Sequence, residues 1–97
     1  MDRLKGKVAL ITGGAGGQGT EEALLFAREG AAIVIGDVAD EKGEELVKRI
    51  RETGAEALYV HLDVTSQRDW DSAVASIKEK LGALHILINN AGINGPG

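Results

Sequence analysis

The stretch TGGAGGQG, residues 12–19, holds five glycines in eight residues. Glycine loses more backbone freedom on folding than any other residue, so a cluster this dense needs a physical reason. Either the chain turns tightly there, or another backbone or a ligand comes close to the main chain. The segments on either side of the cluster decide what kind of turn it makes.

A strand is expected before the cluster and a helix after it. Residues 7–12, KVALIT, form a short apolar run with β-branched side chains, which is typical of a strand buried on both faces. Residues 19–30 contain good helix formers and end at Gly30, which suits a left-handed C-terminal cap. A second buried strand, residues 31–37, ends in Asp37. The cluster therefore leaves a strand and opens a helix.

The same alternation continues along the chain. Helices are expected over residues 39–54 and 66–82, and strands over residues 56–63 and 84–89. The residues expected at the ends of these helices are Asp40 as an N-cap, Gly54 and Gly82 as closing glycines, and Ser66 with Asp69 as a capping box. Short strands alternating with helices indicate an α/β fold, in which a parallel sheet has helices on both faces.

In this setting the glycine cluster is a candidate phosphate-binding turn. The first N–H groups of a helix have no partner within the helix, and the helix dipole favours an anion at that end. Glycines let the pyrophosphate of a dinucleotide approach the backbone. Two patterns fit the cluster, G-x-G-x-x-G through Gly14, Gly16 and Gly19, and T-G-x-x-x-G-x-G through Gly13, Gly17 and Gly19. Glycine alone does not choose between them.

Asp37 is a candidate ligand for a ribose. It ends the second expected strand, 18 residues beyond Gly19, where an acid can accept hydrogen bonds from the adenosine ribose hydroxyls. A 2′-phosphate would bring negative charge against this carboxylate. The neighbours Gly16, Gly36 and Val38 offer no cation to offset that charge. The sequence therefore predicts NAD as the cofactor in preference to NADP.

Composition excludes several other classes of protein. The 97 residues suffice for one small domain, and the formal net charge of −4 argues against a nucleic-acid partner. The sequence contains no cysteine, so disulfides and thiolate metal sites are excluded. His61 and His85 stand a whole helix apart and do not indicate a metal site. No apolar run has the length of a secretory signal or a membrane helix, so we expect a cytoplasmic protein with no membrane partner.

Four motifs together resemble the N-terminal part of the short-chain dehydrogenase/reductase family. They are TGGAGGQG, GD at residues 36–37, LDVTS at residues 62–66 and ILINNAG at residues 86–92. The resemblance implies a truncated Rossmann-type, doubly wound parallel sheet with the order β-α-β-α-β-α-β and strand order 3-2-1-4. Residues 1–97 would then be a single, partial dinucleotide-binding domain.

The resemblance also implies a set of cofactor-binding residues. Gly13, Gly17 and Gly19 correspond to the glycines of the cofactor loop, which Gly16 and Gln18 also line. Asp37 corresponds to the ribose ligand that implies NAD, and Asp63 and Val64 flank the adenine. The end of the fourth strand, beside the adenosine ribose, is shaped by Asn90, Ala91 and Gly92, while Asn89 steadies that strand.

The catalytic half of the family's site is not found in this sequence. In the family a tyrosine, a lysine four residues later and a serine act on the substrate, beyond the NNAG motif. Here Tyr59 is followed at the fourth position by Asp63, and we expect it to pack within its strand. The first functional hypothesis is the NAD-binding part of an oxidoreductase that moves hydride between NAD and an alcohol or ketone. The alternatives are a non-catalytic nucleotide-binding module and a self-assembling scaffold with a vestigial nucleotide loop.

The fourth expected strand predicts self-association. With no fifth strand in the sequence, it would leave unpaired backbone groups at an edge of the sheet, together with the apolar side chains Leu84, Ile86, Leu87 and Ile88. It carries no lysine or proline to discourage pairing with another chain. We therefore expect a homo-oligomer, most simply a dimer joined near residues 86–89.

Overall fold

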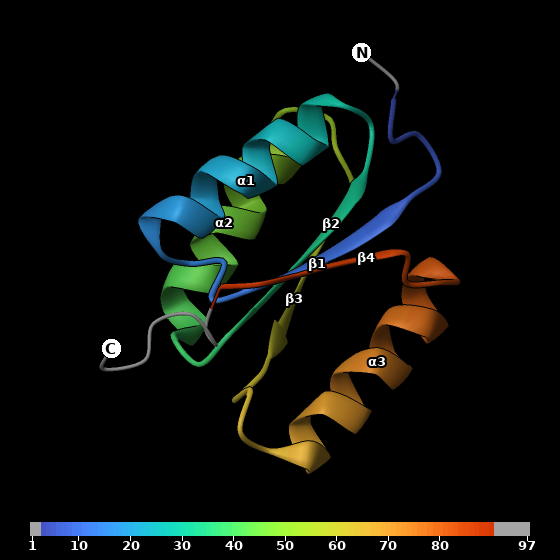
Figure 1. Cartoon of the computed structure of the whole chain (residues 1–97). Coiled ribbons are helices and arrows are strands. Elements are labelled where there is room, and N and C mark those ends of the chain that lie inside the picture. Colours follow the sequence, from blue (N-terminus) through green and yellow to red (C-terminus); the bar gives the residue numbers. More distant parts are fainter. Residues whose placement is uncertain (1–2, 91–97) are drawn as a thin grey trace.

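A computed structural model describes residues 3–90, which form a four-stranded parallel sheet between two layers of helices (Figure 1). The strands are β1 (Val8–Thr12), β2 (Ala32–Asp37), β3 (Ala57–His61) and β4 (Ile86–Asn89). The helices are α1 (Gly17–Arg28), α2 (Asp40–Glu52) and α3 (Gln67–Leu81). The strand order is β3-β2-β1-β4. The predicted α/β class, element order and strand order are confirmed.

The two faces of the sheet have separate apolar cores. Helices α1 and α2 cover one face, and α3 covers the other (Figure 1). On the first face Ile11 and Ile35 pack with Ile50 of α2, and on the second Leu10 and Val34 pack with Ile77 of α3. Every residue of β1 is buried, because neighbouring strands and helices enclose it on all sides. This explains the continuous apolar run rather than an alternating one.

The strand register brings the functional candidates to one edge of the sheet. Thr12 pairs with Gly36 of β2 and with Asn89 of β4, and Asp37 pairs with His61 of β3. All four strands are parallel, so their carboxyl ends meet at this edge. Ligands of open α/β sheets bind outside that edge. The loops that leave β1, β2 and β3 therefore converge where a ligand would be expected.

Most of the expected helix ends are found as predicted. Gly30, Gly54 and Gly82 have positive φ angles of 98°, 94° and 87°, so each closes its helix in the left-handed conformation. The Ser66 hydroxyl accepts a hydrogen bond from the Asp69 N–H at 3.1 Å and caps α3. The second half of the expected capping box does not form, because the Asp69 carboxylate accepts from the Asp63 N–H instead, at 2.9 Å.

The expected N-cap of α2 is wrong. The cap position is occupied by Ala39, and Asp40 is already the first helical residue. Its carboxylate makes no capping hydrogen bond and binds two side chains of β3 instead. The physical reason is that β3 ends beside the start of α2, and its tyrosine and histidine compete for the carboxylate that the backbone would otherwise use.

Two further features bear on possible functions. Within residues 3–90, no helix combines the length and apolar character needed to cross a membrane. Over the same residues, no three or more histidine, cysteine, aspartate or glutamate side chains are gathered so that they could hold a metal ion.

Candidate functional site

The glycine-rich turn joins β1 to α1 and contains glycines of two kinds. One kind is required by the protein itself. Gly13 has a φ of 65°, and a Cβ on Gly19 would lie 2.6 Å from the Cα of Gly14. A Cβ on Gly14 would lie 2.9 Å from the carbonyl oxygen of Ile11. These three glycines let the turn fold back tightly onto β1.

The second kind, Gly16 and Gly17, has no such requirement. Among the residues that the structure describes, a Cβ on Gly17 would meet no atom within 4 Å, and one on Gly16 would meet only the Gly13 carbonyl oxygen, at an ordinary 3.6 Å. Both residues are exposed, and neither has a positive φ. They form the N-terminal end of α1, where Gly16 offers no side-chain cap. A ligand could therefore approach the backbone of the turn at this end of the helix.

Asp37 joins this turn to the loop after β2. Its Oδ1 accepts a hydrogen bond from the Ala39 N–H at 3.0 Å, and its Oδ2 accepts one from the Ala15 N–H at 3.1 Å. The carboxylate is therefore held between its own loop and the middle of the glycine cluster. Sequence spacing suggested that these two features act together, and the structure brings them into direct contact.

Asp63 and Val64 line the same region as Asp37. A small hollow of about 170 Å³ is bounded by six residues from three loops: Gly13, Asp37, Val38, Leu62, Asp63 and Val64. Hydrogen bonds from the hydroxyl and the N–H of Thr65 lower the pKa of Asp63, so this carboxylate is ionised at neutral pH. A larger hollow of about 1070 Å³ lies at the opposite edge of the sheet, and no candidate cofactor residue lines it.

The end of β4 closes the other side of the turn. The Thr12 hydroxyl donates to Asn89 Oδ1 at 2.7 Å, which fits the expected steadying of the strand. Asn90 is buried, and its Nδ2 donates to Glu22 Oε1 at 2.6 Å. This contact could not be predicted from the sequence, because the two residues lie 68 positions apart. The remaining candidates of this motif, Ala91 and Gly92, lie outside the described residues.

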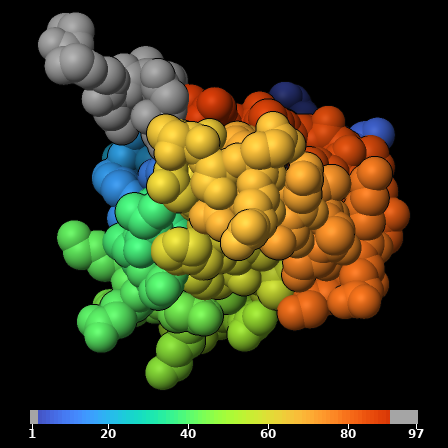
Figure 2. Space-filling model, turned by 90° about the horizontal axis from the view of Figure 1, so that it is seen from below, coloured from blue at the N-terminus to red at the C-terminus, as the bar shows by residue number. Residues whose placement is uncertain are grey.

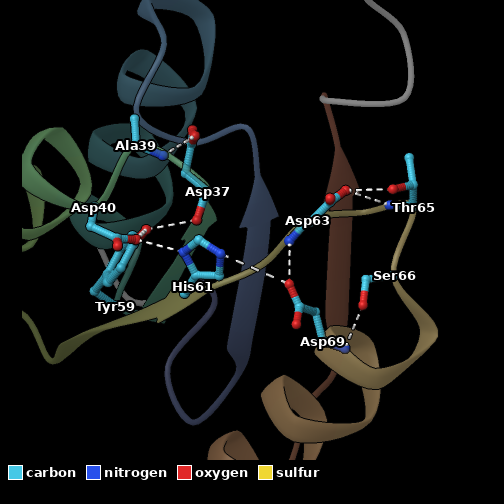
Figure 3. A network of polar contacts seen from close by, with 9 residues as sticks. All are labelled: Asp37, Ala39, Asp40, Tyr59, His61, Asp63, Thr65, Ser66 and Asp69. Carbon is cyan, nitrogen blue, oxygen red and sulfur yellow. Dashed lines mark hydrogen bonds and ion pairs between the residues drawn. The ribbon is translucent and has the colours of Figure 1, made fainter.

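A polar network that sequence reasoning missed lies beside Asp37 (Figure 3). Tyr59 packs its ring against α2 at Gly43, where a Cβ would lie 2.1 Å from the ring. Its hydroxyl lies between the Asp37 carbonyl oxygen, at 2.6 Å, and Asp40 Oδ1. Burial and the nearby Asp40 carboxylate raise the pKa of Tyr59, so the phenol stays protonated. The expected packing role is therefore incomplete, because the hydroxyl also ties β2 to α2.

His61 completes this network. Its Nδ1 lies 2.7 Å from Asp40 Oδ1, and its Nε2 lies 4.0 Å from Asp69 Oδ2. The hydrogen bonds from Tyr59 and His61 lower the pKa of Asp40, and the Asp40 carboxylate in turn raises the pKa of His61. The histidine–aspartate pair is exposed, so its electrostatic stabilisation is modest.

Rossmann-type proteins have a parallel sheet with a glycine-rich turn after the first strand and an acid at the end of the second. This chain has the same arrangement. Residues 7–97 match the family model described as short chain dehydrogenase. The chain therefore belongs to the short-chain dehydrogenase/reductase family, whose members are oxidoreductases that use nicotinamide dinucleotides.

Individual relatives agree with this assignment. A 2,5-dichloro-2,5-cyclohexadiene-1,4-diol dehydrogenase of Sphingobium indicum is 50% identical over 96 residues, which are 99% of this chain and 38% of that protein. The 3-beta-hydroxysteroid dehydrogenase of Comamonas testosteroni is 43% identical over 96 residues, which are 99% of this chain and 37% of that protein. The crystal structure of NAD+-bound xylitol dehydrogenase superposes with a TM-score of 0.85 at 36% identity, over 89% of this chain and 33% of that one. The chain spans less than two-fifths of the length of these relatives.

Proposed function

We propose that this chain is a single, partial dinucleotide-binding domain that holds NAD(H) at the carboxyl edge of its sheet. The observation that carries the proposal is the open backbone at Gly16 and Gly17, next to Ala15, whose N–H binds the Asp37 carboxylate. Among residues 3–90, no contact requires glycine at these two positions. A pyrophosphate approaching the first N–H groups of α1 supplies the missing reason.

Different residues of the site contact different parts of the dinucleotide. The turn from Gly13 to Gly19, with Gln18, faces the pyrophosphate, and Asp37 accepts hydrogen bonds from the adenosine ribose. The hollow beside Asp63 and Val64 receives the adenine, and the segment from Asn90 to Gly92 borders the ribose. The Asp37 carboxylate favours a ribose hydroxyl over a 2′-phosphate, so NAD is preferred to NADP.

The whole protein is proposed to be an oxidoreductase that acts on an alcohol or ketone. Bound NAD would supply the hydride acceptor for such a reaction. The residues of this chain bind and orient the cofactor, and none of them matches the tyrosine–lysine pair that moves the substrate proton. The relatives named above are called dehydrogenases, which supports this reading over a non-catalytic module or a vestigial scaffold.

Binding without turnover is the expected result for the 97-residue chain. Titration with NADH, followed by the change in nicotinamide fluorescence, is expected to give saturable binding. Addition of a panel of ketones is expected to leave the NADH absorbance constant, because general acid–base catalysis typically contributes 10²–10⁴-fold and its groups are missing. No binding at millimolar NADH would overturn the proposed function. NADH oxidation in proportion to protein concentration would show that the chain contains catalytic groups of its own.

We also propose that β4 joins two copies of the chain. Within residues 3–90 it pairs with β1 alone, and the Leu87 side chain is 51% exposed. A second copy could pair with the edge of β4 that faces away from β1 and cover this side chain. Ile86 and Ile88 pack against the core beneath α1 and α2, so substituting them would also disturb folding.

Leu87→Lys is therefore the sharper test of this dimer. Sedimentation is expected to give a dimer for the unsubstituted chain and a monomer for Leu87→Lys, because a lysine on a strand edge opposes pairing. The matched control is Leu25→Lys, because this leucine is 49% exposed, much like Leu87, and belongs to α1 rather than to β4. It is expected to remain dimeric. A monomeric unsubstituted chain at low micromolar concentration would refute this proposal.

A further inference from the structure

His61 stands between two helices that cover opposite faces of the sheet. Asp40 begins α2, and Asp69 lies in the first turn of α3. The two ring nitrogens of His61 face these two carboxylates, Nδ1 toward Asp40 at 2.7 Å and Nε2 toward Asp69 at 4.0 Å. In the space-filling view, the start of α2 in green and the segment after β3 in yellow form one continuous surface (Figure 2). One imidazole thus connects both helical layers.

The connection reaches the wall of the candidate cofactor site. Asp69 Oδ2, the atom that faces His61, also accepts a hydrogen bond from the Asp63 N–H at 2.9 Å. Asp63 lines the small hollow together with Asp37. On the other side Tyr59 links Asp40 to the Asp37 carbonyl oxygen. Both walls of the hollow are therefore tied to His61 through one intervening side chain or two (Figure 3).

We propose that His61 is a proton-controlled strap, which holds α2 and α3 together at the mouth of the hollow when its ring is protonated and releases α3 when it is neutral. The inference rests on the proposed function, since the hollow is assigned to the adenosine part of NAD(H). It adds that cofactor affinity depends on pH through a residue that need not touch the cofactor.

The contacts of His61 with Asp40 and with Asp69 respond differently to loss of a proton. A neutral imidazole keeps one N–H, and Nδ1–H remains suited to donate to Asp40. The proton that is lost is then the one on Nε2, which leaves a lone pair facing the Asp69 carboxylate. Attraction therefore becomes repulsion between Nε2 and the Asp69 carboxylate, while the contact with Asp40 is kept. Asp69 is then free to turn away, and the Asp63 N–H loses its acceptor.

The charged groups around His61 set the direction of the effect. The groups that act on it are Asp40 of α2, Asp69 of α3 and Asp63 of the loop after β3, and all three favour the cation. The hydrogen bond to Asp40 is the largest cause that raises the pKa of His61 above its ordinary 6.5. The contribution of His61 to stability is therefore complete below pH 6.5 and is lost as the pH rises through the raised value. The lowered pKa of Asp40 makes its contribution present above pH 3.8 and lost as the pH falls further.

Binding of NADH is expected to weaken as the pH rises through the pKa of His61. The expected loss is about two- to five-fold, the size typical of one exposed ion pair. Linkage is reciprocal, so saturating NADH must raise the pKa of His61 by the matching amount. A histidine that merely stabilises the fold would show no such response to the cofactor.

The chain has two histidines, which makes the experiment direct. Proton NMR would follow both imidazole rings between about pH 5.5 and 9, with and without NADH, while fluorescence gives NADH affinity over the same range. The variants are His61→Gln, which removes the titrating ring, and Asp69→Asn, which removes the negative charge that faces Nε2. The matched control is His85→Gln. In the native chain His85 Nδ1 accepts a hydrogen bond from the Val8 N–H at the opposite edge of the sheet.

The strap requires a His61 pKa above 6.5 that falls in Asp69→Asn and rises with NADH. It also requires that the pH dependence of NADH affinity disappear in His61→Gln and persist in His85→Gln. A His61 pKa at or below 6.5 in the free protein, or equal pH dependence in His61→Gln and the unsubstituted chain, overturns it. Failure of NADH to bind at any pH overturns the proposed function and the coupling together. In that case the response of the His61 pKa to Asp69→Asn still decides whether the strap exists.

Discussion

Asp37→Ala is expected to weaken NADH binding by about 10- to 100-fold and to abolish the preference for NADH over NADPH. A hydrogen bond to a charged group contributes about 1.5–3 kcal/mol, and each 1.4 kcal/mol is a factor of ten in affinity. The carboxylate is already held in place by the Ala39 and Ala15 N–H groups, so little of its binding energy is spent on ordering it. Removing its charge also removes the repulsion that a 2′-phosphate meets.

Fluorescence titration with both cofactors measures this change. Asp37→Asn separates charge from shape, because its amide oxygen can still accept from the Ala39 N–H. The affinity of Asp37→Asn for NADPH is expected to approach the affinity of the same variant for NADH. Asp71→Ala serves as the matched control, since this exposed aspartate on α3 binds only Gln67 among the described hydrogen bonds. An unchanged cofactor ratio in Asp37→Ala, with folding intact by circular dichroism, would contradict the assignment of Asp37 to the ribose.

Gly17→Val is expected to lose cofactor binding, whereas Gly14→Val is expected to lose stability. A Cβ at position 17 would meet no atom of the described residues within 4 Å, so this variant should fold normally and lose NADH binding by at least about 100-fold. A Cβ at position 14 would lie 2.9 Å from the Ile11 carbonyl oxygen and 3.1 Å from the Ile35 side chain. Overpacking of this kind typically costs about 1–3 kcal/mol of stability. Gly14→Val should therefore unfold at a lower temperature.

The two variants together test which glycine pattern binds the cofactor. Thermal unfolding without ligand is measured first, so that loss of fold is not mistaken for loss of binding. NADH affinity is then measured at a temperature where both variants are folded. If Gly17→Val bound NADH as tightly as the unsubstituted chain, the T-G-x-x-x-G-x-G pattern would not describe this site. Gly17→Ala offers a milder step, in which a single methyl group occupies the open space.

The sequence by itself determined the fold and the general position of the site. Buried strands, amphipathic helices and closing glycines are local signals, which depend on neighbours within a few residues. The helix-closing role of Gly30, Gly54 and Gly82 was predictable because only a left-handed turn ends those helices tightly. The pairing of the glycine cluster with Asp37 was also predictable, because parallel strands deliver both to the same edge of the sheet.

The tertiary structure alone decided which side chains meet across that edge. Asn90 binds Glu22 and His61 reaches Asp69 because the strand register and the placement of α1 and α3 bring them within range. Asp40 would cap its helix in isolation, yet Tyr59 and His61 take its carboxylate because β3 ends beside α2. Glycine is one letter in the sequence, but only the packing separates Gly14 and Gly19, which the fold requires, from Gly16 and Gly17, which it leaves open. Such contacts depend on the distances between elements, and a pattern along one chain segment does not encode those distances.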